Sequence, residues 1–448
     1  MSQRTFKDFT FQPFLYEVID KLNFREPTPI QGEVIPYALK KQSLIGQSHT
    51  GSGKTHAYLL PLFNQIDVTH NHVQAVITVP TRELAMQIYD EVRKMIEYAD
   101  EEESIRAKLI IGGTDKQKMM DKLKRPPHII VGTPGRILDL VMEGALDLYT
   151  ASSMVIDEAD LLIDLGLIEE TDQILVRMPE KLQIMVFSAT FPVQLQHFLK
   201  KYIENPKHIT ITGQSLVPET MEHRLIPLRH REKADLMVEI TNVIHPYLAL
   251  IFVNKKEHAD ELANQLIQKG LETGIMHGGL TPRERKRTLK NIKNLEYQYI
   301  VATDLAARGI DIPGISHIFN AELPKEPEDY IHRVGRTARA GLEGTAVSFY
   351  KDKDEKLIEK LESKGIDFTH YDIKNNEWVE IKDWDQRRKR EKSENDQLEA
   401  EAWKKVRKKK KVKPGYKKKM KKEAEQVKKQ LKKKQQQQNK NRGNRGRR

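Results

Sequence analysis

Short apolar segments recur along the first half of the chain and alternate with stretches that have helical spacing. The segments cover residues 43–45, 75–80, 108–111, 128–131, 154–156 and 184–187. Strands that are apolar throughout, with helices between them, are typical of a parallel sheet that is covered on both faces. We therefore predict an α/β domain over residues 1–208, with a helical segment at residues 6–22 near its start.

A second series of apolar segments follows residues 205–223, whose two prolines and few charges are typical of a connector. The segments of this series cover residues 248–253, 274–277, 299–302, 317–320 and 345–349. The pattern predicts a linker over residues 209–223 and a second α/β domain, of about 150 residues, over residues 224–378. The composition then changes, and residues 379–448 form a basic tail of low complexity.

The charge of the chain is concentrated in this tail. From Lys404 to Arg448 there are 23 Lys or Arg residues against 2 Asp or Glu residues, a net charge of +21, whereas the preceding 403 residues carry −9. The absence of cysteine excludes disulfides, thiolate metal sites and a cysteine nucleophile. No run approaches the ~18 apolar residues of a membrane span, and the first residues lack the apolar core of a secretory signal. We expect a cytoplasmic protein.

The segment GQSHTGSGKT, residues 46–55, contains the second half of a phosphate-binding loop. Small residues allow backbone N–H groups to close around an anion, and the helix that follows favours negative charge at its start. Lys54 would contact the β- and γ-phosphates, and Thr55 would bind Mg2+. Because Ser48 replaces the first glycine of the strict pattern, a Gly/Ser turn followed by a chance Lys-Thr pair is the alternative.

Polar residues follow five of the apolar segments, at residues 80–83, 112–113, 133–136, 157–160 and 188–190. The carboxyl ends of parallel strands meet at one edge of a sheet, which is where such folds bind ligands. Asp157 at this edge can hold Mg2+ through water, and Glu158 can orient and deprotonate an attacking water. The alternative is an acidic helix start that interacts only with the helix dipole.

The segment HRVGRTAR, residues 332–339, is the most distinctive part of the second domain. Its arginines are three residues apart, so in a helix they would share one face. Guanidinium groups suit the charge of a transferring phosphoryl group, although a solvated basic face is the alternative. If these arginines complete a site that begins in the first domain, hydrolysis requires the two domains to close.

Together these motifs resemble a DEAD-box RNA helicase over residues 6–350, with Asp157-Glu158-Ala159-Asp160 as the tetrapeptide that gives the family its name. The length and the lysine-rich tail most resemble its bacterial cold-shock members. The resemblance implies two tandem RecA-like domains, the cofactors ATP and Mg2+, and a Q motif that reads adenine through an amide donor and acceptor. The implied nucleotide-binding residues are Phe24, Gln31, Ser48, His49, Thr50, Gly51, Ser52, Gly53, Lys54, Thr55, Gly309 and Asp311.

The resemblance also implies roles in catalysis, coupling and RNA binding. The implied catalytic residues are Lys54, Asp157, Glu158, Arg336 and Arg339, the metal ligands are Thr55 and Asp157, and the residues that couple hydrolysis to strand separation are Ser188, Ala189 and Thr190. The implied RNA contacts are Thr81, Arg82, Gly112, Gly113, Thr133, Pro134, Gly135, Arg136, Asn254, His277, Gly278, Arg285 and Thr303. These residue types suit backbone phosphates and 2′-hydroxyls, so we expect little sequence preference.

The tail has too few apolar residues to offset its ordering entropy, so we expect it to be mostly disordered, with intermittent helix over residues 387–434. Its charge favours a salt-sensitive RNA tether over a merely solvated tail. The expected activity is RNA-stimulated ATP hydrolysis with local unwinding of short duplexes. The alternatives are an ATP-gated RNA clamp or annealing chaperone dominated by the tail, and a DNA translocase. RNA is the expected partner, with ribosomal or RNA-degradation complexes, no membrane, and a monomer or weak dimer.

Overall fold

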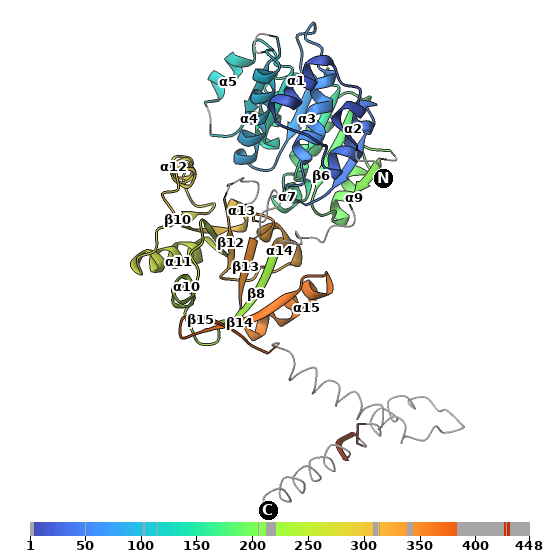
Figure 1. Cartoon of the computed structure of the whole chain (residues 1–448). Coiled ribbons are helices and arrows are strands. Elements are labelled where there is room, and N and C mark those ends of the chain that lie inside the picture. Colours follow the sequence, from blue (N-terminus) through green and yellow to red (C-terminus); the bar gives the residue numbers. More distant parts are fainter. Residues whose placement is uncertain are drawn as a thin grey trace, which may run out of the picture. The chain divides into compact units, whose positions relative to one another are not determined.

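The structure is a computed structural model, and it divides the chain into two units, Met1–Val379 and Glu380–Arg448. It describes residues 4–49, 51–101, 104–113, 115–204, 206–211, 221–307, 312, 314–337, 344–382, 425–426 and 428–430. Figure 1 shows helices flanking the strands of two separate sheets in the first unit. Of the second unit, the structure describes residues 380–382, which include the end of a strand, and the helical residues 425–426 and 428–430.

The first sheet has seven strands in the order β3-β4-β2-β5-β6-β1-β7, and the described pairs are all parallel. The strands are β1 Leu44–Gln47, β2 Ala75–Thr78, β3 Ala107–Ile110, β4 Ile129–Gly132, β5 Ser153–Ile156, β6 Gln183–Ser188 and β7 Lys207–Thr210. The first six overlap the apolar segments of the sequence. They confirm the prediction of a parallel sheet, because strands buried on both faces need apolar residues throughout.

Helices cover both faces of this sheet, and its side chains alternate between two hydrophobic clusters. Ile77 and Val131 belong to one cluster, whereas their neighbours Val76 and Ile130 belong to the other. This alternation follows from the two-residue period of a strand. The helices are η1 Phe6–Asp8, α1 Pro13–Lys21, α2 Pro29–Leu39, α3 Lys54–Gln65, α4 Arg82–Tyr98, α5 Lys116–Leu123, α6 Pro134–Met142, α7 Ala159–Asp164, α8 Ile168–Leu175 and α9 Val193–Leu199.

The second sheet has eight strands in the order β10-β11-β9-β12-β13-β8-β14-β15. The strands are β8 Met221–Pro227, β9 Ala249–Val253, β10 Thr273–Met276, β11 Tyr299–Thr303, β12 His317–Asn320, β13 Gly344–Tyr350, β14 Phe368–Lys374 and β15 Glu377–Glu380. The helices around it are α10 Lys233–Thr241, α11 Lys256–Gln268, α12 Pro282–Lys293, α13 Asp304–Ala307, α14 Pro327–Val334, η3 Asp352–Asp354 and α15 Glu355–Ser363. The tandem α/β architecture is therefore confirmed.

The linker predicted over residues 209–223 was too long at both ends. Strand β7 reaches Thr210, and β8 begins at Met221, while residues 212–220 lie outside the described part. These two strands were not predicted because each alternates polar with apolar residues and has no continuous apolar run. In β8, for example, Met221 and His223 are buried while Glu222 and Arg224 are partly exposed.

The end of the second sheet is a hairpin that the sequence pattern did not predict. Asn375 and Asn376 both have positive φ, at 52° and 58°, between β14 and β15. This is the conformation of a two-residue hairpin turn, which asparagine tolerates better than most residues. Strand β15 ends at Glu380, two residues inside the range predicted as tail. Among the described helices, none combines the length and the apolar character that crossing a bilayer demands.

Candidate ATP and RNA site

The phosphate-binding loop connects β1 to α3, at the carboxyl edge of the first sheet. Gly51 and Gly53 have φ of 81° and 93°, which is the left-handed region, and α3 starts directly after Gly53. A Cβ on Gly53 would lie 2.8 Å from both Gln31 Nε2 and Thr28 Oγ1. Ser48 and Ser52 face each other across the loop with their Oγ atoms 2.7 Å apart. The loop thus has the open backbone that an anion site needs, and Thr50 lies outside the described residues.

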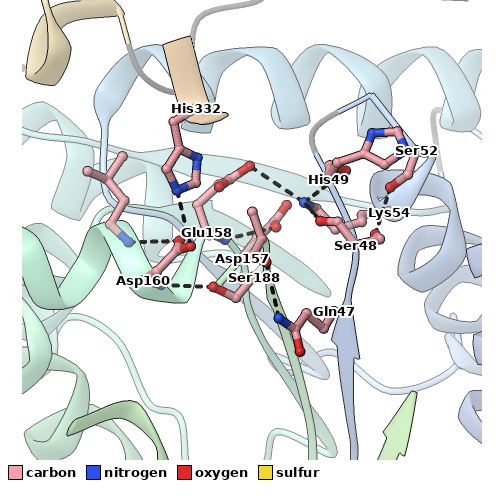
Figure 2. A network of polar contacts seen from close by, with 12 residues as sticks. Gln47, Ser48, His49, Ser52, Lys54, Asp157, Glu158, Asp160, Ser188 and His332 are labelled. Carbon is pink, nitrogen blue, oxygen red and sulfur yellow. Dashed lines mark hydrogen bonds and ion pairs between the residues drawn. The ribbon is translucent and has the colours of Figure 1, made fainter. Parts of the chain in front are cut away.

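Lys54 is 6% exposed and points into this loop (Figure 2). Its Nζ donates to the carbonyl oxygens of Ser48 and His49, at 2.9 and 3.4 Å. The same Nζ lies 3.9 Å from Glu158 Oε1. A buried ammonium that is held by two loop carbonyls and faces a carboxylate is positioned for a phosphate group at the loop.

Asp157 and Glu158 follow β5, which is separated from β1 by β6 in the sheet. Asp157 is buried, and its two oxygens accept from the Tyr58 hydroxyl and from the Glu158 backbone N–H, both at 2.9 Å. Burial and the neighbouring Glu158 raise the pKa of Asp157 to about 6, against the opposing effect of Lys54. Glu158 has φ of 49° and is the residue before α7. Oxygen donors from Asp157 and Thr55 match the ligand preference of Mg2+.

Asp160 connects this region to two other segments (Figure 2). Its Oδ2 accepts from the Thr190 backbone N–H and hydroxyl, at 2.9 and 2.8 Å, and lies 3.5 Å from His332 Nε2 on α14. The Asp160 backbone N–H donates to Ser188 Oγ at 3.2 Å. Burial would raise the pKa of Asp160, but His332 and then Thr190 outweigh it and lower that pKa well below its usual range.

The predicted coupling segment therefore contacts the acidic tetrapeptide. Ala189, which lies between the two contacting residues, instead joins this segment to β1, because its carbonyl oxygen accepts from Gln47 Nε2 at 3.3 Å. Asp160 and His332 are not among the site residues predicted from the sequence. Both lie in motifs that the sequence analysis singled out, but their contact joins residues 172 positions apart, and spacing gives no signal for such a pair.

Phe24 and Gln31 lie beside the start of α3. The ring of Phe24 meets that of His56 edge-on, with centroids 4.8 Å apart, and stacks on Phe6 at 6.3 Å. Gln31 is buried, and its Oε1 accepts from Thr28 N while its Nε2 donates to Gly53 O, at 3.0 and 3.1 Å. The amide thus also joins α2 to the phosphate loop. One lone pair and one N–H of this amide remain for a ligand.

The predicted RNA contacts of the first domain lie at neighbouring strand ends of the same sheet. Arg82 begins α4, and its guanidinium packs so closely on Gly112 and Gly113 that a Cβ on either would lie 2.8 Å from a guanidinium nitrogen. Thr81 caps α4 by accepting from Leu84 N at 3.2 Å. At the end of β4, Thr133 precedes α6, whose first residues are Pro134, Gly135 and Arg136, and the Arg136 guanidinium contacts Asp139.

In the second domain, most of the predicted RNA contacts lie at the carboxyl ends of β9, β10 and β11. Asn254 uses its amide internally, because Oδ1 accepts from Arg333 and Nδ2 donates to Leu323 O. His277 is buried, with Nε2 2.9 Å from Asp260 Oδ1 and Nδ1 accepting from Gly279 N. Thr303 ends β11, and Gly278 has no neighbour within 4 Å of an added Cβ.

Arg285 on α12 forms an ion pair with Glu83, with Nε 2.5 Å from Oε1. It also donates to Ala306 O at 3.1 Å. Since Glu83 follows Arg82 on α4, this pair joins predicted RNA-binding segments from the two series of strands.

The arginine motif differs from its predicted helical arrangement. Helix α14 ends at Val334, because Gly335 follows, and Arg336 lies in the turn beyond it, where it is 6% exposed. Arg333 and Arg336 therefore do not share a helical face. Arg333, the first arginine of the motif, is not among the implied catalytic residues. It is 1% exposed and binds Asp304 through Nε and Nη2, at 2.5 and 2.8 Å. Arg339, Gly309 and Asp311 lie outside the described residues.

Comparison with known proteins agrees with this geometry. The family models that match are the DEAD/DEAH box helicase model over residues 28–198 and the helicase conserved C-terminal domain model over residues 232–341. Among curated relatives, DEAD-box ATP-dependent RNA helicase CshB of Bacillus subtilis is 52% identical over 94% of this chain and 95% of its own. CshB of Staphylococcus aureus is 43% identical, over 87% of this chain and 86% of its own.

Solved structures have the same fold. Saccharomyces cerevisiae Dbp5 bound to RNA and ADP BeF3 superposes with a TM-score of 0.73 and 29% identity, covering 87% of this chain and 99% of that one. The helicase Mss116 bound to ssRNA and UDP-BeF gives a TM-score of 0.73 with 26% identity, covering 84% of this chain and 81% of that one. The resemblance inferred from the motifs is thus confirmed, and so is the narrower resemblance to bacterial cold-shock members, since these curated relatives are CshB helicases. The chain belongs to the DEAD-box family of ATP-dependent RNA helicases.

Proposed function

We propose that this RNA-dependent ATPase hydrolyses one ATP at the phosphate loop and uses the cycle to open short RNA duplexes or to remodel ribonucleoprotein. The observation that supports the proposal most strongly is the convergence of Lys54 with the acidic pair after β5, where Lys54 Nζ lies 3.9 Å from Glu158 Oε1. A cation for the phosphates, a carboxylate for a metal and a carboxylate for water are the components that phosphoryl transfer requires.

In this proposal the first domain holds the nucleotide. Phe24 and Gln31 bind the adenine, residues 48–53 surround the phosphates with backbone N–H groups, and Lys54 binds the β- and γ-phosphates. Thr55 and Asp157 hold Mg2+, which when bound neutralises charge that develops on the phosphates. Glu158 orients the attacking water and takes its proton.

The second domain completes the site in the closed enzyme. Arg336 and Arg339 bind the γ-phosphate, while Gly309 and Asp311 contact the rest of the nucleotide. Ser188, Ala189 and Thr190 transmit the state of the nucleotide to the RNA. The support for this coupling role is the contact of Thr190 and His332 with the same carboxylate, that of Asp160.

RNA binds along the carboxyl ends of the strands in both domains. The residues that we propose as RNA contacts are Thr81, Arg82, Gly112, Gly113, Thr133, Pro134, Gly135, Arg136, Asn254, His277, Gly278, Arg285 and Thr303. Their support is their shared position after parallel strands, where backbone amides, hydroxyls and guanidinium groups can reach phosphates. In the structure Arg285 binds Glu83, so RNA has to displace this ion pair before Arg285 can bind a phosphate.

The proposal keeps the division into a first domain at residues 1–208, a second domain and a basic tail that tethers RNA. It moves the junctions only where β7, β8 and β15 require it. We further propose that the protein acts in the cytoplasm, as a monomer or weak dimer, in ribosome assembly or RNA degradation. Crosslinking to cellular RNA with sequencing of the adducts tests the assignment to a process.

Stimulation of ATP turnover by single-stranded RNA and by DNA of the same sequence tests the choice of substrate. We expect RNA to stimulate strongly and DNA weakly, and equal stimulation would favour a DNA translocase.

Deletion of residues 384–448 distinguishes the helicase from a tail-dominated clamp. We expect the truncated protein to unwind a short RNA duplex with weaker RNA affinity. Loss of unwinding together with full annealing activity in the isolated tail would favour the clamp.

A further inference from the structure

Tyr58 has a buried hydroxyl group that none of the roles above uses. It lies on α3, four residues after Lys54 and three after Thr55, with its side chain 0% exposed. Its ring packs against Phe187, with centroids 5.1 Å apart. A phenyl ring of the same size would make this apolar contact equally well, so packing does not explain the hydroxyl.

The Tyr58 hydroxyl instead contacts one of the two residues assigned to the metal. It donates to Asp157 Oδ2 at 2.9 Å, and Thr55, the other assigned ligand, lies one helical turn before Tyr58 on α3. The phenolic proton is thus used on the carboxylate that would face the cation.

The orientation of the Asp157 carboxylate is fixed from both of its oxygens. Oδ2 accepts from Tyr58, and Oδ1 accepts from the Glu158 backbone N–H, also at 2.9 Å. The last torsion of an aspartate side chain is otherwise broad. Partners that hold metal ligands in one orientation raise the affinity of a site, and their loss typically costs about 10- to 100-fold in metal binding.

We propose that Tyr58 is a positioning residue for the magnesium site, and that its hydroxyl sets the orientation of the Asp157 carboxylate toward the cation. The inference rests on the proposed function, because that proposal assigns Asp157 and Thr55 to the metal. The inference goes beyond the proposed function because it assigns to α3 a residue that controls how much Mg2+ the enzyme needs. A merely structural role predicts a change in stability without a change in metal dependence.

The test uses Tyr58→Phe in the full chain, with Mn2+ as the probe. Free Mn2+ is followed by its electron paramagnetic resonance signal during titration of the protein with saturating ADP. We expect Mn2+ affinity in the nucleotide complex to fall about 10-fold, while ADP affinity in EDTA changes less than about 2-fold. The Mg2+ concentration for half-maximal RNA-stimulated ATPase should rise by a similar factor, with turnover approaching the wild-type rate at saturating Mg2+.

Tyr330→Phe is the matched control. Tyr330 is also fully buried, and its hydroxyl contacts His223 at 2.9 Å in the second sheet region, away from the assigned ligands. It should leave Mn2+ affinity unchanged, and the urea midpoint of each variant checks folding.

The variant Asp157→Asn distinguishes a failure of the inference about Tyr58 from a failure of the metal-site assignment. If Asp157→Asn weakens Mn2+ binding and Tyr58→Phe does not, the inference about Tyr58 is wrong and the site assignment stands. If neither changes Mn2+ binding, the metal-site assignment itself fails.

Discussion

Gly53 has a backbone conformation that a side chain would disturb, and it lies where the loop meets α3. With φ of 93°, an alanine there pays about 1–2 kcal/mol for the left-handed conformation. Its Cβ would also collide with Gln31 Nε2 and Thr28 Oγ1, at 2.8 Å. We expect Gly53→Ala to lower the free energy of unfolding by about 1–2 kcal/mol and to weaken ADP binding at least about 10-fold, because Gln31 has to move.

Gly32→Ala is the matched control for this prediction. Gly32 lies inside α2, and an added Cβ there meets nothing within 4 Å. Alanine in place of a helical glycine should stabilise by up to about 1 kcal/mol. Urea titration and fluorescent ADP titration of both variants check the pair. Equal ADP affinity for the two would show that Gly53 is only a loop glycine.

His223 makes the stability of the second domain depend on pH. Burial lowers the pKa of His223 from 6.5 to about 4, with Asp367 and Glu222 opposing, and the neutral ring contacts the Tyr330 hydroxyl. Between pH 4 and pH 6.5 the unfolded state binds the proton more readily than the folded state. The contribution of His223 to the free energy of unfolding is therefore fully present above pH 6.5 and falls as the pH drops toward 4. The difference amounts to at most about 3 kcal/mol.

We expect His223→Gln to reduce this dependence, because glutamine keeps an acceptor for Tyr330 but does not titrate. Urea midpoints at pH 7.5 and pH 5 measure it. Some dependence remains in the variant, since burial also lowers the pKa of His128 to about 4. A variant whose midpoint changes with pH as much as that of the wild type would contradict the role of His223.

At the scale of elements, Arg333 joins α14 to the residues that directly follow β9, β11 and β12. Besides the two bonds to Asp304, it donates to Asn254 Oδ1 at 2.8 Å and to Glu322 O at 2.6 Å. It also faces the ring of Phe252, with Cζ 5.0 Å from the centroid. Replacement of one partner in a buried ion pair leaves the other charge uncompensated.

We therefore expect Arg333→Met to lower the free energy of unfolding by about 3–5 kcal/mol, measured by urea denaturation. Lys118→Met is a suitable control, because the Lys118 side chain is 81% exposed and its pair with Asp115 spans 4.0 Å. It should change stability by less than about 0.5 kcal/mol. A cost below 1 kcal/mol for Arg333→Met would mean that the network contributes specificity instead of stability.

The sequence predicted the elements whose signal is local. Apolar runs such as residues 75–80 became strands because central parallel strands are buried on both faces. Strand β7 has only Ile209 buried, and β14 and β15 also mix polar with apolar residues, so no such run marks them. Likewise, the three-residue spacing of the arginines suggested a longer helix, but Gly335 ends α14 before Arg336.

For the candidate site too, only the features with a local signal in the sequence could be predicted. Lys54 and Glu158 could be proposed as site residues because their motifs are contiguous in sequence, and the structure places their charged groups 3.9 Å apart. Contacts across long separations were not, since no spacing encodes them. The bond from Tyr58 to Asp157 and the packing of Arg82 on Gly112 are set by how the strands order themselves in the sheet.

At the scale of the whole molecule, the tail should dominate the salt dependence of RNA binding. Each phosphate contact on single-stranded RNA contributes about −0.7 to the slope of log affinity against log salt. If about five tail cations bind phosphates, deletion of residues 384–448 should reduce the slope by about 3.5. Deletion of residues 435–448 alone, which removes 5 Lys or Arg residues, should reduce it less. Fluorescence anisotropy of labelled RNA between 50 and 300 mM salt, a range of about sixfold, measures the slope for both truncated proteins. A slope that does not change on deletion would mean that the tail is merely solvated.

The central claim is that ATP bound at Lys54 is hydrolysed by a water that Glu158 activates, and one measurement tests it most directly. This is the rate of phosphate release by Glu158→Gln at saturating RNA and ATP. Glutamine keeps the size of the side chain but cannot take a proton, so we expect the rate to fall about 100- to 10,000-fold while ATP and RNA affinities stay within about threefold. Phosphate release at the wild-type rate would contradict the account.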